Sequence, residues 1–182
     1  MFPFVKLREY AQEHDIPIIS PKTQQILKNL LSIYRPISIL EIWSAIGYST
    51  LMMAHHLTQY TTEGMIYSFE ISLNAYLHLL SNLNHFKEYL PVIKPFNIDF
   101  LSYPSRHLPL FDFIFIDAQK SLYVNFLKKS ISHLKPGWII IIDDVGAFPT
   151  KTDRLWNYLK QTNLNFEMLP AEQNDKLLII KF

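Results

Sequence analysis

The stretch ISILEIWSAIGYSTLMMAHHL, residues 37–57, decides the fold of this chain. An apolar run of strand type (37–42) leads into a short loop, and an apolar run with helical spacing (48–57) leads out of it. Loops of this kind press their backbone against a ligand in many cofactor sites, where glycine is usual because a Cβ would collide with the ligand. Gly47 is the one glycine of this loop, and Trp43 stands at its first turn position. We therefore interpret the loop as a cofactor loop in which most glycines have been replaced.

The rest of the chain continues the alternation of strands and helices. Strands are expected at 37–43, 64–71, 90–98, 111–117 and 137–144, several of them apolar on both faces, as in parallel sheets covered by helices. Further helices are expected at 20–34, at 72–86, from 123 to a stop at Pro136-Gly137, and near 151–161. The segments 165–169 and 176–182 follow as two strands without a helix between them, which indicates a closing hairpin. The pattern predicts an α/β fold with a Rossmann-like sheet of about seven strands, mostly parallel, and a C-terminal antiparallel hairpin.

The bulk composition limits the classes of function. The 182 residues suit a single domain over 1–182, with 49% hydrophobic and 18% charged residues, as in an ordered globular protein. A net charge of +1 without a Lys/Arg block gives no support for a nucleic-acid or membrane partner. The absence of cysteine excludes disulfides and thiolate metal sites. The start of the sequence lacks the layout of a signal peptide, so a cytoplasmic protein is expected.

Acidic residues recur where the expected strands end. In doubly wound sheets the ligand binds beyond the carboxyl ends of the strands, so these positions are candidates for a site. One strand-end acid is usually a turn or helix cap, whereas five at one edge favour a binding site. The five acids are Glu41, Glu70, Asp117, Asp143 and Asp144.

The motifs that are missing narrow the choice of cofactor. The Gly-x-Gly-x-x-Gly motif of dinucleotide binding and the Gly-Lys-Ser/Thr of nucleotide triphosphate binding are both absent. Glu70 ends the second strand 23 positions after Gly47, where an acid takes ribose hydroxyls. A ribose partner without a diphosphate cradle favours S-adenosylmethionine, and Ser49 near the next helix start offers a partner for its methionine end.

The sequence resembles the metal-dependent O-methyltransferases of the catechol and caffeoyl-CoA type over roughly residues 16–182. The motifs are PIISPKTQQIL, EIWSAIGYST, YSFEIS, FDFIFIDAQKSLY and LKPGWIIIIDDVGAF. The resemblance implies a cofactor site in which Ser49 lies near the methionine carboxylate, Glu70 holds the ribose, and Ala118 and Gln119 lie near the adenine. The cofactor-binding positions it implies are Glu41, Trp43, Gly47, Ser49, Glu70, Asp117 and Ala118.

The resemblance also implies a divalent cation such as Mg²⁺, held by Asp117, Asp143 and Asp144, with Asp144 standing where the family has asparagine. Oxygen ligands suit such a hard cation, which would hold two neighbouring oxygens of the acceptor. Lys120 would take the proton of the acceptor hydroxyl. The plainer interpretations are that Asp143-Asp144 opens a turn and that Lys120 is a solvated residue at a helix start. The implied partner is a small, catechol-like hydroxylated molecule, and a homodimer is compatible with the family.

Three departures from the family keep a second function open. Trp43 replaces a glycine near the methionine end, the connection between Asp144 and the next helix is short, and so is the segment before PIISP. The chain is therefore either an O-methyltransferase or a methyltransferase-fold binding or scaffold module without catalysis. An amino-directed nucleic-acid methyltransferase is disfavoured, since the fourth strand is not followed by an Asn/Asp-Pro-Pro-aromatic motif.

Overall fold

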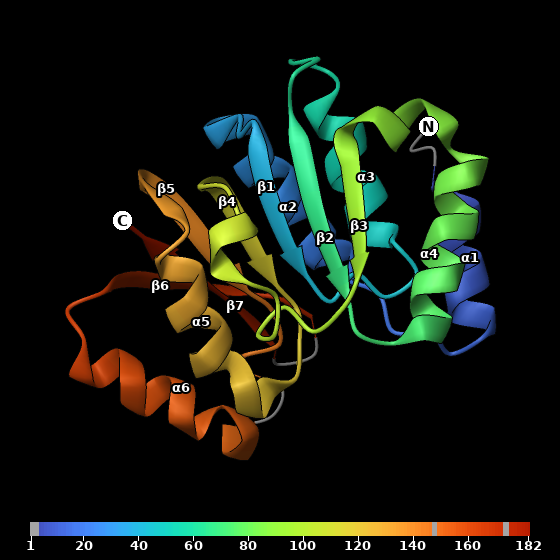
Figure 1. Cartoon of the computed structure of the whole chain (residues 1–182). Coiled ribbons are helices and arrows are strands. Elements are labelled where there is room, and N and C mark those ends of the chain that lie inside the picture. Colours follow the sequence, from blue (N-terminus) through green and yellow to red (C-terminus); the bar gives the residue numbers. More distant parts are fainter. Residues whose placement is uncertain (1–3, 147–148, 173–174) are drawn as a thin grey trace.

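The computed structural model describes residues 4–146, 149–172 and 175–182. Its centre is a seven-stranded sheet with the order β3-β2-β1-β4-β5-β7-β6 (Figure 1). The strands are β1 (Ser38–Ile42), β2 (Met65–Glu70), β3 (Ile93–Asn97), β4 (Phe111–Ile116), β5 (Leu134–Ile142), β6 (Asn165–Pro170) and β7 (Lys176–Lys181). The first five run parallel, whereas β7 pairs antiparallel with both β5 and β6. The predicted α/β class, the mostly parallel sheet and the C-terminal hairpin are confirmed.

Six α-helices cover the two faces of the sheet. They are α1 (Val5–Glu13), α2 (Pro21–Tyr34), α3 (Tyr48–Leu57), α4 (Leu73–His85), α5 (Tyr123–Ile131) and α6 (Pro149–Gln161). Helices α1 to α4 contribute to one buried cluster and α5 and α6 to the other, so the sheet lies between two helical layers (Figure 1). Ser20 caps α2 through a hydrogen bond from the Thr23 amide, with Pro21 at the first helical position, as the sequence predicts.

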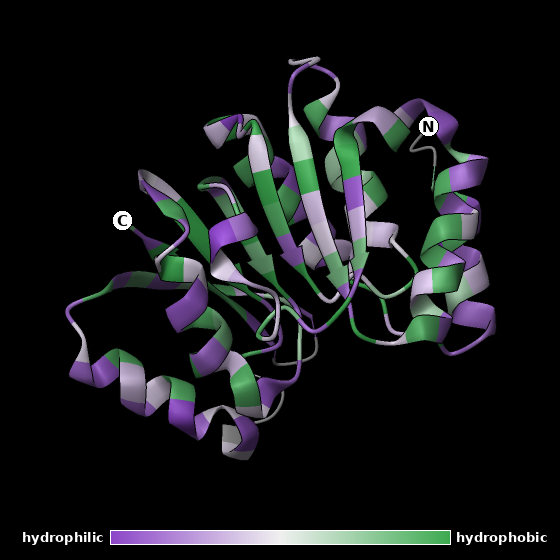
Figure 2. Cartoon of the chain, in the orientation of Figure 1, coloured by the Kyte–Doolittle hydropathy of each residue, from purple (hydrophilic) through white to green (hydrophobic). Residues whose placement is uncertain are grey.

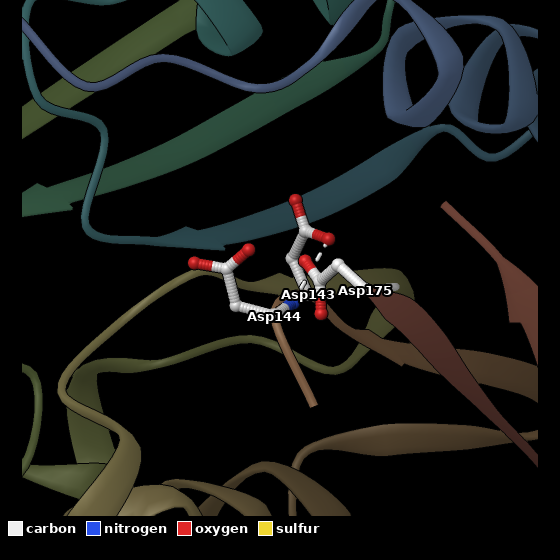
Figure 3. A group of neighbouring side chains, drawn as sticks. All are labelled: Asp143, Asp144 and Asp175. Atoms are coloured by element: carbon white, nitrogen blue, oxygen red, sulfur yellow. Dashed lines mark hydrogen bonds between the residues drawn. The ribbon is translucent and has the colours of Figure 1, made fainter. Parts of the chain in front are cut away.

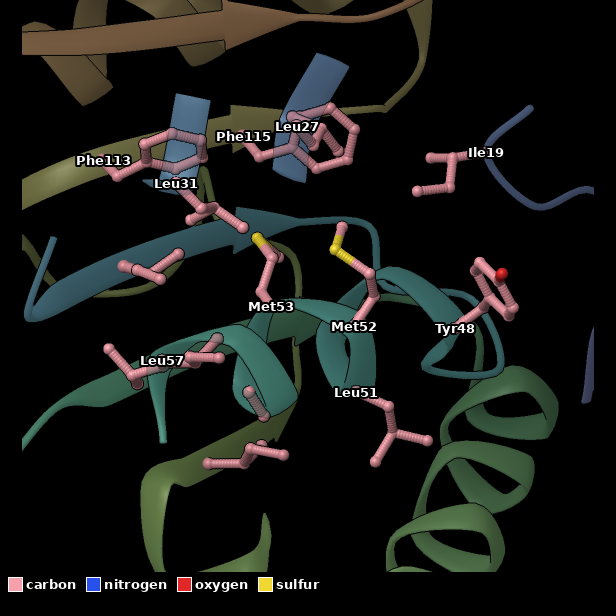
Figure 4. Close-up of a cluster of buried hydrophobic side chains, with 14 of the residues drawn as sticks. Ile19, Leu27, Leu31, Tyr48, Leu51, Met52, Met53, Leu57, Phe113 and Phe115 are labelled. Carbon is pink, nitrogen blue, oxygen red and sulfur yellow. The ribbon is translucent and has the colours of Figure 1, made fainter. Parts of the chain in front are cut away.

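The alternation of side chains along β4 shows why the strands are apolar on both faces. Phe113 and Phe115 point into the layer of α2 and α3, and Ile114 and Ile116 into the layer of α5 and α6. The sheet is accordingly the most hydrophobic part of the fold in Figure 2. In Figure 4, Phe113 and Phe115 lie close to Leu27 and Leu31 of α2. Burying a side chain of this size contributes about 1.5–3 kcal/mol, and the two layers together hold the strand ends at fixed positions.

Three details differ from the sequence-based expectation. Helix α5 ends at Ile131, and Pro136-Gly137 lies inside β5, where the register against β4 shifts and Gly137 has a φ of 84°. The Pro-Gly pair therefore forms a strand irregularity and not a helix stop. The third strand, expected from residue 90, begins at Ile93, because a 3₁₀ helix (Lys87–Val92) includes residues 90–92. Helix α1 was not predicted.

The carboxyl ends of β1, β2, β4 and β5 open onto one edge of the sheet, where the predicted site residues lie (Figure 1). The short connection from Asp144 to α6 includes residues 147–148, which are outside the described part of the chain. Among the described helices, none is both long and apolar enough to cross a lipid bilayer.

Candidate active site

The backbone of the loop after β1 follows a path that normally needs glycine. Its φ angles are positive at Trp43 (70°), Ala45 (48°) and Gly47 (87°). The left-handed conformation costs a non-glycine residue about 1–2 kcal/mol, so the loop keeps its shape against the preference of two of its residues. Backbone amides hold it in place, because Trp43 N and Ser44 N both donate to the Phe69 carbonyl, at 2.8 and 3.1 Å. The loop therefore has a backbone of the glycine type although Gly47 is its one glycine.

Gly47 is required for a reason other than ligand contact. A Cβ built on Gly47 would lie 2.3 Å from Cδ1 of Leu79 on α4. The glycine thus leaves room for the Leu79 side chain, in addition to supplying the positive φ at the start of α3.

Glu41 supports the loop from inside the protein. It lies within β1, is fully buried, and its carboxylate accepts hydrogen bonds from the hydroxyls of Ser49 and Thr50, both at 2.5 Å, and of Ser68 at 3.2 Å. Burial raises the pKa of Glu41 to about 7 against the opposing effect of these hydroxyls. Glu41, predicted to bind the cofactor, is a buried support of the loop, and the hydroxyl of Ser49, predicted to lie near a methionine carboxylate, donates its hydrogen bond to Glu41. The amides in the first turn of α3 remain suited to an anionic ligand end.

Glu70 lies at the end of β2 with its carboxylate fixed by two backbone amides. Ala45 N donates to Oε2 at 2.8 Å and Ser72 N to Oε1 at 2.7 Å. A carboxylate has about four acceptor positions, so both oxygens can still accept ribose hydroxyls. The described residues also include a buried hydroxyl without a hydrogen-bond partner, that of Ser44 in the same loop. The donors and acceptors around the loop fit a ligand with an anionic end and neighbouring hydroxyls.

The indole of Trp43 lies on the side of the sheet that carries α5 and α6. It packs against the buried cluster of that layer and lines a cavity of about 460 Å³ with Ala118, Gln119, Lys120, Ser121 and Lys151. Trp43 thus lies beside Ala118 and Gln119, the residues that the resemblance assigns to the adenine. That its indole fills the methionine end of the cofactor site stays a prediction.

Trp43→Gly is expected to strengthen binding of S-adenosylhomocysteine about tenfold, equivalent to ~1.4 kcal/mol, because it widens the cavity beside Ala118 and Gln119. Glycine also adopts the positive φ without strain, which offsets part of the lost indole packing. We expect a loss of stability below the roughly 3–5 kcal/mol typical of a fully buried tryptophan. Calorimetry and thermal unfolding of the same variant measure the two effects. A large fall in melting temperature with unchanged affinity would show that Trp43 is a core residue only.

A second cavity, of about 380 Å³, is strongly acidic. Asp143, Asp144 and Asp175 each offer a carboxylate oxygen within 4.8 Å of the others, and Figure 3 shows the three side chains gathered at one place. Asp117, the third residue of the predicted set, lines the same cavity and lies outside this close group of three. The cavity is lined by Pro17, Ile18, Ile19, Ser20, Thr23, Asp117, Asp143, Asp144, Glu172 and Asp175.

The sequence reasoning missed Asp175 because it precedes a strand. Since β7 runs antiparallel to β5, its first residues lie at the edge where β5 ends. An acid just before an antiparallel strand is therefore equivalent to an acid just after a parallel one, and this signal was available in the sequence. Amides of Gly146 and Lys176 donate to Oδ1 of Asp175 at 3.0 and 2.8 Å and fix its orientation.

Asp144 occupies a backbone position that suits its residue type. Its φ is 56°, and its amide donates to Oδ1 of Asp143 at 2.9 Å. Asp and Asn tolerate the left-handed conformation better than other non-glycine residues, which gives a backbone reason for either of them here. Thr23 of α2 approaches Asp143 Oδ1 from the other wall of the cavity, at 3.5 Å.

Burial and mutual repulsion raise the pKa values of these acids. Burial, with Asp144 as the next cause, raises the pKa of Asp117 to about 7. Burial and the charge of Asp117 raise the pKa of Asp143, and burial with a hydrogen bond to Asp175 raises that of Asp144. Lys120 reduces the negative charge, because its Nζ lies 2.7 Å from Oδ2 of Asp144. So many oxygen ligands in one partly enclosed space suit a hard divalent cation.

Comparison with known proteins agrees with this geometry. A family model described as O-methyltransferase matches residues 4–166. Caffeoyl-CoA O-methyltransferase 1 of Eucalyptus globulus is 30% identical over 173 residues, covering 85% of this chain and 61% of the relative. Caffeoyl-CoA O-methyltransferase 3 of Nicotiana tabacum is 30% identical over 167 residues, covering 85% and 62%. The chain thus spans about three fifths of the length of these curated relatives.

Solved structures share the fold. An O-methyltransferase from Bacillus cereus in complex with SAH superposes with a TM-score of 0.82 at 20% identity, covering 97% of this chain and 89% of that one. The O-methyltransferase TomG from Streptomyces achromogenes, in complex with SAM, gives 0.81 at 18% identity, covering 100% and 90%.

Proposed function

Because the chain belongs to the O-methyltransferase family, we propose that it transfers the methyl group of S-adenosylmethionine to a hydroxyl of a small, catechol-like acceptor with the help of a divalent cation such as Mg²⁺. The observation that carries the proposal is the convergence of four aspartates on one cavity. This cavity lies at the same edge of the sheet as the loop after β1. Family membership supports the cofactor, whereas the acceptor and the cation rest on the chemistry of the cavity.

The cofactor would lie across the loop after β1. Glu70, held by its two backbone amides, would accept the ribose hydroxyls. The first turn of α3 would receive the methionine carboxylate through its amides. Ala118 and the indole of Trp43 would flank the adenosine end, because both line the same cavity.

Asp143, Asp144 and Asp175 would hold the cation, with Asp117 close by in the same cavity. When bound, the cation would lower the pKa of an acceptor hydroxyl and fix two neighbouring acceptor oxygens. The fit rests on the donor set, which consists of carboxylates whose pKa values are raised by burial and by one another's charge. Residues 17–20 and Thr23 would form the opposite wall of the acidic cavity and contact the acceptor.

Lys120 would act on the acceptor hydroxyl. In its neutral form Nζ would take the proton while an N–H is still donated to Asp144, which lies 2.7 Å away. The acceptor oxygen attacks the methyl carbon, the carbon–sulfur bond breaks, and S-adenosylhomocysteine leaves. Alignment of oxygen, carbon and sulfur contributes most of the acceleration, so the two cavities must hold acceptor and cofactor in register.

A second function remains open because of Trp43. An indole against Ala118 and Gln119 narrows the cofactor site, which suits a binding or scaffold module that has lost catalysis.

Calorimetry with S-adenosylmethionine and S-adenosylhomocysteine, with and without Mg²⁺, tests the proposal, together with mass detection of methylated catechol. The enzyme is expected to bind both ligands and to methylate catechol only when Mg²⁺ is present. Binding without methylation of any catechol-like acceptor favours the scaffold function. Failure to bind either ligand overturns both the cofactor and the proposed reaction.

A further inference from the structure

Arg8 of α1 joins three helices next to the cofactor loop. Its Nε donates to the Tyr48 hydroxyl at 3.0 Å, and its Nη2 donates to Oε1 of Gln24 at 2.9 Å. The Tyr48 hydroxyl itself donates to the same Gln24 oxygen at 2.8 Å, which closes a triangle of hydrogen bonds. The guanidinium carbon also lies 4.4 Å from the centre of the Tyr48 ring. A planar guanidinium supplies both contacts at once from one rigid group.

The triangle connects the two parts of the candidate site. Tyr48 is the first residue of α3, directly after Gly47, and is 2% exposed. Gln24 lies in the first turn of α2, next to Thr23, whose hydroxyl reaches Asp143 in the acidic cavity. Arg8 therefore ties the exit of the cofactor loop to the helix that forms one wall of the acidic cavity.

Helix α1 does not depend on Arg8 for its attachment. Phe4, Leu7 and Ala11 are buried on its inner side. The Phe4 ring packs edge-on against Phe86 and Tyr89, with centroids 4.9 and 5.8 Å apart. These apolar contacts hold the helix on the protein. The polar contacts of Arg8 are therefore available to position Tyr48 and Gln24.

We propose that Arg8 is a positioning residue for the cofactor, acting through Tyr48. By fixing the ring and hydroxyl of Tyr48, Arg8 fixes the first turn of α3. In the function proposed above, on which this inference rests, the amides of this turn face the anionic end of the ligand. A first turn held in its bound position needs less ordering when the ligand arrives, and this raises affinity.

Arg8→Met should weaken S-adenosylhomocysteine binding about tenfold in calorimetry. Arg154→Met removes the same group from an exposed position on α6 and should leave affinity unchanged. Tyr48→Phe should weaken binding by a similar factor, and the double variant should be no weaker than Arg8→Met alone, because both changes break one triangle. Affinity that stays unchanged in Arg8→Met while the melting temperature falls would reduce Arg8 to a structural role, and additive effects would overturn coupling through Tyr48.

Hydrogen exchange without ligand tests the inference independently of cofactor binding. Amides of residues 43–50 should exchange faster in Arg8→Met than in the wild type, whereas those of β1 and β4 should not change. Unchanged exchange at 43–50 would overturn the positioning role. If the wild type binds no S-adenosylhomocysteine, the proposed function fails, and the exchange rates alone decide the role of Arg8 in ordering the loop.

Discussion

Asp143→Asn is expected to abolish the rise in melting temperature that we expect Mg²⁺ to cause in the wild type, and to lower methyl transfer at least ~100-fold. Asp143 belongs to the close carboxylate group and is 4% exposed, so a cation in the cavity would lose a ligand that water cannot easily replace. A hundredfold loss corresponds to about 2.7 kcal/mol of transition-state stabilisation, within the several kcal/mol that a metal ion supplies. Asparagine keeps an oxygen for the Asp144 amide and the Thr23 hydroxyl, so the loop should remain folded.

The control is Asp153→Asn, which removes the same charge from an exposed position on α6 and should change neither quantity. Addition of EDTA to the wild type should reproduce the effect of Asp143→Asn, because both remove the cation. A variant that keeps the full Mg²⁺-dependent shift would show that these aspartates do not hold the ion, and the cavity would then need another explanation.

Lys120→Met is expected to lower turnover by about 100-fold or more while leaving the affinity for S-adenosylhomocysteine within about twofold of the wild type, because a general base contributes roughly 10²–10⁴ to the rate and does not hold the cofactor. The variant should also bind Mg²⁺ more tightly, since Asp144 loses the ammonium group that lies 2.7 Å from it. Single-turnover kinetics and calorimetry measure these quantities.

Lys128→Met is the matched control for Lys120, since this lysine is exposed on α5. It should leave turnover and both affinities unchanged. Equal losses of turnover and cofactor affinity in Lys120→Met would assign Lys120 to the cofactor site, and retained turnover would remove it from the reaction.

The sheet and its helices could be predicted because their signals are local. The two-sided apolar strands, the Ser20 cap of α2 and the two adjacent strands at the end all reflect neighbouring residues, and each is confirmed. Pro136-Gly137 was misinterpreted for the same reason, since a Pro-Gly pair marks a helix end and a strand irregularity equally well in sequence. Pairing with β4 decides between a helix end and a strand irregularity, and the local sequence pattern does not contain this contact.

The candidate site was predicted less completely because its geometry depends on distant contacts. Placing the acids at one edge needed only the strand ends, but the membership of Asp175 needed the direction of β7. The side of the sheet on which the Trp43 indole lies depends on the positive φ of Trp43. This angle could not be predicted from a loop sequence that contains so little glycine. The hydrogen bond from the Ser49 hydroxyl to the buried Glu41 was not predicted either, because it joins residues of two different elements.

The strand order has a consequence for how the protein is made. The acidic cavity draws residues from both halves of the sequence, and the Lys22 amide donates to Glu172, 150 positions later, at its rim. Strand β7 lies between β5 and β6, so β5 has no partner on that side until residues 176–181 have left the ribosome. During synthesis the cofactor loop and Glu70 emerge early, whereas the group of Asp143, Asp144 and Asp175 is complete only after Asp175 has emerged. A nascent chain could therefore fold around a nucleoside well before it could hold a metal ion, and cation binding would report that synthesis had passed β7.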